Sequence, residues 1–173
     1  MILYLKQIGD LSELKNKRVR IAQRGIILRG DTILLLRTSK GDLKFPGGGT
    51  KGNETYDEAL IREIREETGY VNVTVTMGDD FGGYYERKVD EYEANTVFES
   101  RSYYMFAEIK DNERVDQKLD DYEKELQFQP EWISIKDAII QNTYALLSDE
   151  EPNDWVEREL TMLKALWEWK HSQ

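Results

Sequence analysis

The feature that most constrains this 173-residue chain is a run of three glycines at residues 47–49, followed by a short segment rich in glutamate. Thr55 with Glu58 forms a capping box, so we expect a helix to begin just after Thr55. Gly69 stands where a residue in the left-handed conformation would end that helix. The sequence therefore predicts a glycine loop that leads directly into a helix of about three turns.

Three glutamates of this helix, Glu63, Glu66 and Glu67, share one face because they are spaced by three and four residues. Two like charges 4 Å apart repel by roughly 4 kcal/mol at an effective dielectric of about 20. A divalent cation removes this repulsion, and carboxylate oxygens are the ligands that Mg²⁺ prefers. The pattern predicts a magnesium site, with Mn²⁺ as a substitute. A solvated acidic face is the alternative that three glutamates alone would favour.

The glycines give a second indication of chemistry. Gly47, Gly48 and Gly49 allow positive φ angles and let backbone N–H groups approach phosphate oxygens. The Gly48 carbonyl is also a candidate metal ligand, because backbone oxygens suit hard cations. A simple tight turn is the alternative role, and the two roles are compatible. Carboxylates for a metal beside bare backbone for phosphate indicate metal-assisted attack on a phosphate ester or anhydride.

The segment resembles the signature of the Nudix hydrolases, G-x5-E-x7-R-E-U-x-E-E-x-G-U, in which U is a bulky apolar residue. Tyr70 fills the last apolar position, which is more often aliphatic, and the resemblance covers only residues 48–70. It implies an α+β fold, a Nudix-type α/β/α sandwich with a central mixed β-sheet. The matching positions are Gly48, Glu54, Arg62, Glu63, Ile64, Glu66, Glu67 and Gly69.

The resemblance implies a Mg²⁺-dependent hydrolase that cleaves a pyrophosphate bond in a nucleoside diphosphate linked to another moiety, by attack of metal-activated water at phosphorus. A catalytically inactive Nudix-fold module that senses a nucleotide is the alternative, and the presence of every box carboxylate disfavours it. A chance match in an unrelated acidic protein is a third interpretation, which the in-register arginine and glycines disfavour.

Residue roles also follow from the resemblance. Arg62 matches the arginine that orients a box glutamate through a salt bridge, and Glu54 matches a supporting position near the metals. The alternative for Glu54 is a helix-dipole contribution of about 0.3–1 kcal/mol. The predicted catalytic residues are Glu54, Arg62, Glu66, Glu67 and Glu125.

The general base is left open among several groups. In the family an additional acid often comes from the loop before the final strand, where Glu125 is the first candidate and Glu123 the second. A solvated loop charge is the commoner role for either residue. Proton transfer by Glu66, or attack by metal-activated water without a separate base, are the alternatives.

Substrate binding requires cationic and aromatic side chains around a cleft. We predict Arg24 and Lys44, together with Gly47, Gly48 and Gly49, as substrate-binding residues, although a surface or core role is commoner for such side chains. The wider set of candidates for the nucleoside is Arg20, Arg24, Lys44, Tyr84, Tyr85 and Arg87.

Two substrate subclasses of the family are disfavoured. Members that cleave ADP-ribose usually carry a proline shortly after the box, and the next proline here is Pro130. Coenzyme A-type members carry an additional upstream motif, for which residues 37–45 leave no room. Nucleoside triphosphates, dinucleoside polyphosphates and nucleotide sugars remain open.

Composition limits the partners. A net charge of −10 argues against a nucleic-acid polymer and is compatible with a small nucleotide substrate when metal ions neutralise the site. The only histidine, His171, lies near the C-terminus, and the chain has no cysteine, which excludes Ser-His-Asp and thiolate chemistry. No apolar run is long enough to span a membrane and no signal pattern opens the chain, so we expect a cytoplasmic protein without a membrane partner. Family members are often dimers, which makes a homodimer the candidate assembly.

Residues 1–173 are expected to form a single domain. Residues 1–17 form either an edge strand or an arm, and residues 29–32 form a hairpin turn. Tyr56, Leu60 and Ile64 should face the core from the box helix. Ser134 should cap one late helix, and Pro152 should open the terminal helix over residues 152–170. Strand patterns occupy residues 18–28, 33–36, 71–76, 81–87, 97–109 and 127–133, and residues 43–45 lead into the glycine loop.

Overall fold

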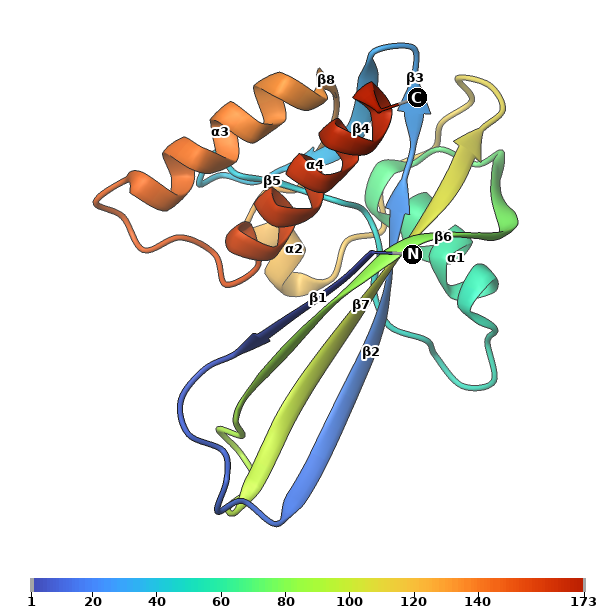
Figure 1. The fold of residues 1–173 in the computed structure, drawn as a ribbon. Coiled ribbons are helices and arrows are strands. Elements are labelled where there is room, and N and C mark those ends of the chain that lie inside the picture. The colour runs from blue at the N-terminus through green and yellow to red at the C-terminus, as the bar shows by residue number, and fades with distance from the viewer. Residues whose placement is uncertain (1, 173) are drawn as a thin grey trace.

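The computed structural model describes residues 2–172, apart from the side chains of residues 77–79 (Figure 1). Its larger sheet has the strand order β1-β6-β7-β2, in which β1 runs parallel to β6, β6 antiparallel to β7, and β7 parallel to β2. These strands are β1 (Ile2–Gln7), β2 (Asn16–Ile26), β6 (Val73–Val89) and β7 (Thr96–Ile109). The sheet is therefore mixed, and β1 and β2 are its edge strands.

The smaller sheet is antiparallel and is built around β4, which pairs with β3, β5 and β8. Its strands are β3 (Leu28–Arg29), β4 (Thr32–Arg37), β5 (Leu43–Lys44) and β8 (Gln129–Ser134). Arg29 pairs with Thr32 across the turn, and Gly30 takes a φ of 57°, so the predicted hairpin at residues 29–32 is confirmed.

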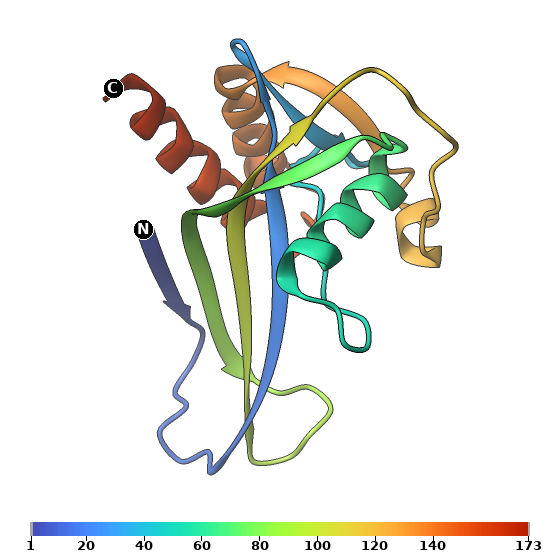
Figure 2. The ribbon, with the colours of Figure 1, turned by 90° about the vertical axis from the view of Figure 1, so that its right-hand side faces the viewer.

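Alternation along β4 explains why helices lie on both sides. Leu34 packs with Leu60 and Ile64 of α1 (Tyr56–Thr68). Ile33 and Leu35 point the other way and pack against α3 (Ile135–Leu147) and α4 (Val156–His171). Figure 2 shows α1 on one side and this helix pair on the other. The predicted α/β/α sandwich with a central mixed sheet is confirmed.

Local helix signals agree with the structure at both ends of α1. Thr55 accepts from the Glu58 backbone N–H while the Glu58 carboxylate accepts from the Thr55 backbone, and Gly69 ends the helix with a φ of 80°. Ser134 likewise caps α3 by accepting from the Asp137 backbone.

Two expectations about helix ends are wrong. Tyr56 is 47% exposed, because the first turn of α1 extends beyond the core and its ring stacks on Tyr103. The terminal helix begins at Val156 and not at Pro152. Asp42 explains this difference, since its carboxylate accepts from the side chains of Asn153 and Trp155 and holds these residues in the preceding loop.

The two-residue strand β5 is held by side chains on its open edge. Asn142 of α3 accepts from the Leu43 backbone N–H at 2.8 Å and donates to the Leu43 carbonyl at 2.9 Å. Glu159 of α4 accepts from the Phe45 backbone N–H at 2.9 Å. Both side chains are fully buried. The helix pair therefore supplies the hydrogen bonds that a neighbouring strand would give, just before the glycine loop.

Replacing Asn142 by Ala should leave two buried backbone groups without partners, at about 1–3 kcal/mol each. We expect a destabilisation on the order of 3 kcal/mol, or a fall in Tm of roughly 6–12 °C for a chain of this length. Thermal unfolding followed by circular dichroism would measure it. Thr143→Ala is the control, because Thr143 bonds only to the carbonyl of Ile139 within its own helix. Equal Tm values for the two variants would contradict this role of Asn142.

The far end of the larger sheet extends beyond the helices (Figure 1) and carries a charge cluster around Glu99. Burial alone would raise the pKa of Glu99, but ion pairs with Lys17, Arg87 and Arg101 outweigh it and hold the pKa at about 2, below the usual 4.5. A depressed carboxyl pKa gives stability that is present above pH 4.5 and is lost as the pH falls towards 2.

Glu99→Gln should therefore lower the Tm at neutral pH, and its Tm difference from the wild type should shrink as the pH falls from about 5 to about 3. Tm measured across that range tests the sign. Glu108→Gln is the control on the same strand, because Glu108 is largely exposed and its pair with Lys110 should contribute little. A difference that stays constant with pH would rule out the ionised Glu99 cluster as its source.

Candidate active site

The glycine loop runs along β2 and is fixed to it by backbone hydrogen bonds. Gly25 donates to the Pro46 carbonyl at 2.8 Å, and Gln23 donates to the Gly48 carbonyl at 2.9 Å. Gly47 has a φ of 139°, and a Cβ placed there would lie 2.0 Å from the Gln23 carbonyl oxygen. Only glycine fits this position, because both its backbone conformation and its close approach to β2 exclude a side chain.

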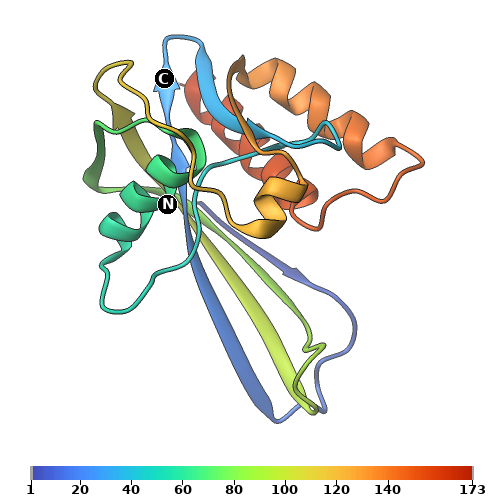
Figure 3. The same ribbon diagram turned by 180° about the vertical axis from the view of Figure 1, so that it is seen from behind.

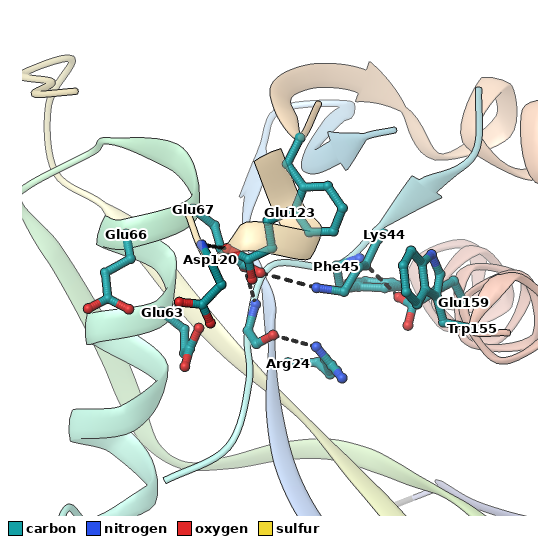
Figure 4. Close-up of polar contacts among 12 residues, drawn as sticks. Arg24, Lys44, Phe45, Glu63, Glu66, Glu67, Asp120, Glu123, Trp155 and Glu159 are labelled. Carbon is teal, nitrogen blue, oxygen red and sulfur yellow. Dashed lines mark hydrogen bonds and ion pairs between the residues drawn. The ribbon is translucent and has the colours of Figure 1, made fainter. Parts of the chain in front are cut away.

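Glu67 differs from the other two box glutamates because it turns into the interior. It is 1% exposed, and its carboxylate accepts from the Gly47 backbone N–H at 2.6 Å and from Lys44 Nζ at 3.1 Å (Figure 4). Burial raises the pKa of Glu67 to about 7, and burial also lowers the pKa of its partner Lys44. The loop, the strand before it and the box helix therefore meet at one carboxylate.

Arg62 gathers the remaining acids of the box. Its Nη1 lies 2.6 Å from Glu63 Oε1 and 3.0 Å from Glu66 Oε2, and its Nε donates to Glu54 at 2.6 Å. The hydrogen bonds from Arg62 lower the pKa of Glu54 to about 2 and raise the pKa of Arg62 itself. Arg62 also donates to the Gly49 carbonyl at 3.0 Å. The repulsion expected among these glutamates is offset by one guanidinium group.

The donors of this region suit a hard divalent cation in their chemistry. Carboxylate oxygens of Glu63 and Glu66 converge on a position that the cationic Nη1 of Arg62 fills. A Cβ at Gly48 would lie 2.7 Å from the Glu63 carboxylate, so the bare backbone lets that group approach the loop. Among the described residues no group of three or more His, Cys, Asp or Glu side chains is gathered tightly enough to hold a metal. Arg62 occupies the point where Glu63 and Glu66 meet, and Glu67 pairs with Lys44 instead.

Of the two acids predicted from the later loop, the structure brings Glu123 and not Glu125 to the carboxylates. Both belong to the short helix α2 (Asp121–Glu125). Glu125 is exposed, whereas Glu123 is buried, and its charge contributes to the raised pKa of Glu67 after burial itself. Glu123 accepts from the Asp120 backbone N–H at 2.8 Å, which turns it back towards the loop. The spacing Asp120-x-x-Glu123 is the helix-start signal that could have favoured Glu123.

A cavity of about 530 Å³ opens next to Lys44, on the face of the larger sheet that α4 approaches. Arg24 is 5% exposed and donates to the Gly47 carbonyl, while its Nε has no hydrogen-bond partner in the described part of the chain. Burial lowers the pKa of Arg24. The cationic residues that line the cavity are Arg20, Arg24, Lys40, Lys44, Lys88 and Arg158. Its aromatic lining residues are Tyr84, Phe98, Tyr122 and Trp155.

The predicted substrate-binding residues therefore divide into two groups. Arg24 and Lys44 line the cavity, as do Arg20 and Tyr84 from the wider set. Tyr85 does not line it, and neither does Arg87, which pairs with Glu99. The strand period explains the division, because Tyr84 and Tyr85 point to opposite faces of β6.

The sequence interpretation missed the far wall of the cavity. Trp155 lines the cavity with its ring centroid 5.9 Å from Lys44 Nζ, and Asp42 holds it through a 2.8 Å hydrogen bond to its Nε1. Arg158 also lines the cavity and pairs with the buried Glu159. No local spacing links these residues to the box, because they are more than 80 positions further along the chain.

The model of the NUDIX domain family matches residues 19–156 of the chain. Two curated relatives match shorter stretches. The ADP-ribose pyrophosphatase of Methanocaldococcus jannaschii is 38% identical over 76 residues, which cover 39% of this chain and 45% of the relative. The RNA pyrophosphohydrolase of Marinomonas sp. is 46% identical over 48 residues, which cover 26% of this chain and 30% of the relative. The chain thus spans less than half the length of these relatives.

Solved structures share the fold at low identity. The E. coli ORF135 protein has a TM-score of 0.53 at 19% identity and covers 95% of this chain and 98% of its own. A UDP-X diphosphatase has a TM-score of 0.56 at 15% identity, covering 90% of this chain and 65% of its own. A C. elegans Ap4A hydrolase has a TM-score of 0.54 at 17% identity, covering 89% of this chain and 99% of its own.

Within residues 2–172, no helix is both long and apolar enough to cross a membrane.

Proposed function

This chain belongs to the NUDIX domain family, and on that premise we propose that it is a Mg²⁺-dependent hydrolase that cleaves a pyrophosphate bond in a nucleoside diphosphate linked to another moiety. One observation carries the proposal: Glu67 contacts both the glycine loop and Lys44, at the edge of a cationic cavity of nucleotide size. The groups that we propose to bind phosphate and metal thus lie next to each other.

In this proposal Glu63, Glu66, Glu67 and the Gly48 carbonyl hold Mg²⁺, with Mn²⁺ as a substitute. The chemistry that the ion supplies when bound is neutralisation of phosphate charge and a lower pKa for the attacking water. Arg62 is the residue that orients Glu63, Glu66 and Glu54, since it contacts all three. Release of Glu63 and Glu66 from Arg62 Nη1 would make their oxygens available to the ion.

Lys44 and Arg24 are proposed to bind the phosphates of the substrate. Both cations are buried at the inner end of the cavity, where the local dielectric strengthens their attraction for an anion. Glu123 replaces Glu125 as our candidate for the acid from the later loop, because it lies beside Glu67 (Figure 4). A carboxylate at that position can accept a proton from water held near the phosphates.

Hydrolysis of a substrate panel tests the proposal. ADP-ribose is suggested by the name of a curated relative, and Ap4A and a UDP conjugate are suggested by the names of solved structures with this fold. A nucleoside triphosphate completes the panel. We expect at least one compound to give two phosphate-bearing products with Mg²⁺, and EDTA to stop the reaction until Mg²⁺ or Mn²⁺ is restored. Binding of these nucleotides without any product would instead favour the inactive sensing module.

A further inference from the structure

Three arginines of β2 point to the same side of the larger sheet. Arg18, Arg20 and Arg24 are separated by even numbers of residues, and β2 pairs with β7 in continuous register from Asn16 to Ile26. Figure 3 shows β2 as a long strand that runs along this sheet. The Arg18 guanidinium group already has partners, because it pairs with Asp90 and stacks on Phe98. Arg20 and Arg24 both line the cavity, four residues apart, which places their Cα atoms about 13 Å from each other.

Arg24 marks the inner end of the cavity. It donates to the Gly47 carbonyl, so it lies next to the loop that contacts Glu67. It has no carboxylate partner within residues 2–172, and its buried Nε has no partner at all there. A buried guanidinium group with an unused donor is a site that an anion would complete.

Arg20 marks the outer end and differs from the other cations that line the cavity. Its side chain makes no hydrogen bond or ion pair with any described residue, whereas the side chain of each of the others has an oxygen partner. These pairs are Arg24 with the Gly47 carbonyl, Lys44 with Glu67, Arg158 with Glu159, Lys88 with Glu91, and Lys40 with the Glu151 carbonyl. Arg20 is thus the lining cation whose side chain has no partner within residues 2–172.

The neighbours of Arg20 fit a phosphate group. Ser100 lies directly beside it in the register of β2 and β7, also lines the cavity, and carries a hydroxyl that can donate a hydrogen bond. Glu86 lies on the other side of Ser100, in the register of β6 and β7. Its carboxylate opposes an anion, so it should weaken binding at this end without removing it.

We infer that the outer end of the cavity is a subsite for a phosphate monoester on the part of the substrate remote from the scissile pyrophosphate, bound by Arg20 and Ser100. This inference rests on the proposed function, because Arg24 and Lys44 then hold the pyrophosphate at the inner end. The preferred substrate carries two anionic groups separated by a sugar or a comparable spacer. A substrate without the distal phosphate leaves Arg20 unused.

NADH and NADPH test the inference, because each contains a pyrophosphate and they differ only in a ribose 2′-phosphate. We expect the KM for NADPH to be about tenfold lower, as one charge-assisted contact at an exposed site can give. Arg20→Ala should raise the KM for NADPH about tenfold, leave its kcat unchanged, and shift the KM for NADH less than twofold. Arg20→Lys should retain part of the preference for NADPH over NADH, and Glu86→Gln should increase that preference.

Lys17→Ala is the matched control, since Lys17 lies on the same strand but on the opposite face, in the Glu99 cluster. If neither dinucleotide is hydrolysed, their inhibition constants against a hydrolysed compound of the panel give the same comparison. Equal constants for the two dinucleotides, or equal shifts of both in Arg20→Ala, would overturn the subsite. Tighter equilibrium binding of NADPH than of NADH, without hydrolysis of any compound, would instead refute the proposed function and still support the subsite.

Discussion

Glu67→Gln should lower the turnover of the best panel substrate by at least about 10²-fold, the lower range of what a positioned catalytic carboxylate contributes. The reason is the loss of the negative charge where the glycine loop, Lys44 and the box helix meet. The glutamine side chain keeps an acceptor oxygen for one of these donors, so we expect the fold to remain. Steady-state kinetics and circular dichroism of the purified variant measure the two effects.

The buried partner of Glu67 provides the control. Removing one member of a buried ion pair costs roughly 3–5 kcal/mol when the other charge is left alone, whereas apolar replacement of both is often neutral. Lys44→Met added to Glu67→Gln should therefore raise the Tm above that of the single variant. It should not restore activity, because both groups serve the chemistry. Activity within tenfold of the wild type in Glu67→Gln would refute the assigned role.

Gly47→Ala should lower the stability of the fold, whereas Gly48→Ala should mainly lower activity, although the two residues are adjacent. At Gly47 the new methyl group would lie 2.0 Å from a backbone oxygen of β2 in a conformation that favours glycine. We expect a loss on the order of 3 kcal/mol or more, seen as a fall in Tm of roughly 6–12 °C.

At Gly48 the methyl group would meet only the end of the Glu63 side chain, at 2.7 Å. That carboxylate can move, so the free energy of unfolding should change by less than about 1 kcal/mol. The movement displaces a proposed metal ligand, and we expect kcat to fall about tenfold or more. The pair therefore separates the loop's structural role from its chemical role. An equal loss of Tm in both variants would show that Gly48 is constrained by packing as well.

Signals that depend on a few neighbouring residues could be interpreted from the sequence. The capping box at Thr55 needs only Glu58, and the end of α1 needs only Gly69, so both ends of the helix were predictable. The strand at residues 33–36 was predictable for the same reason, since a short continuous apolar run is typical of a strand that is buried on both faces. The box itself also lies within one continuous segment, which is why its residues could be identified together.

Features that depend on distant residues could not be interpreted in this way. A spacing of four placed Tyr56 with Leu60, but the core ends before the first turn of α1 reaches it. Pro152 suggested a helix start, and only the contact of Asp42 with Asn153, 111 positions away, explains why the loop continues. Glu67 is buried whereas Glu63 and Glu66 are held by Arg62, and this difference likewise depends on Lys44, which comes from the strand β5.

The hydrogen bonds from Asn142 and Glu159 to Leu43 and Phe45 affect how the chain can fold while it is being synthesised. The glycine loop and the box helix leave the ribosome early, but the side chains that anchor the strand before the loop are 99 and 114 positions further along the chain. Such long-range contacts form late, after the cost of closing a large loop has been met. A nascent chain can therefore hold an almost complete signature segment and still lack a working loop until its last helix has emerged.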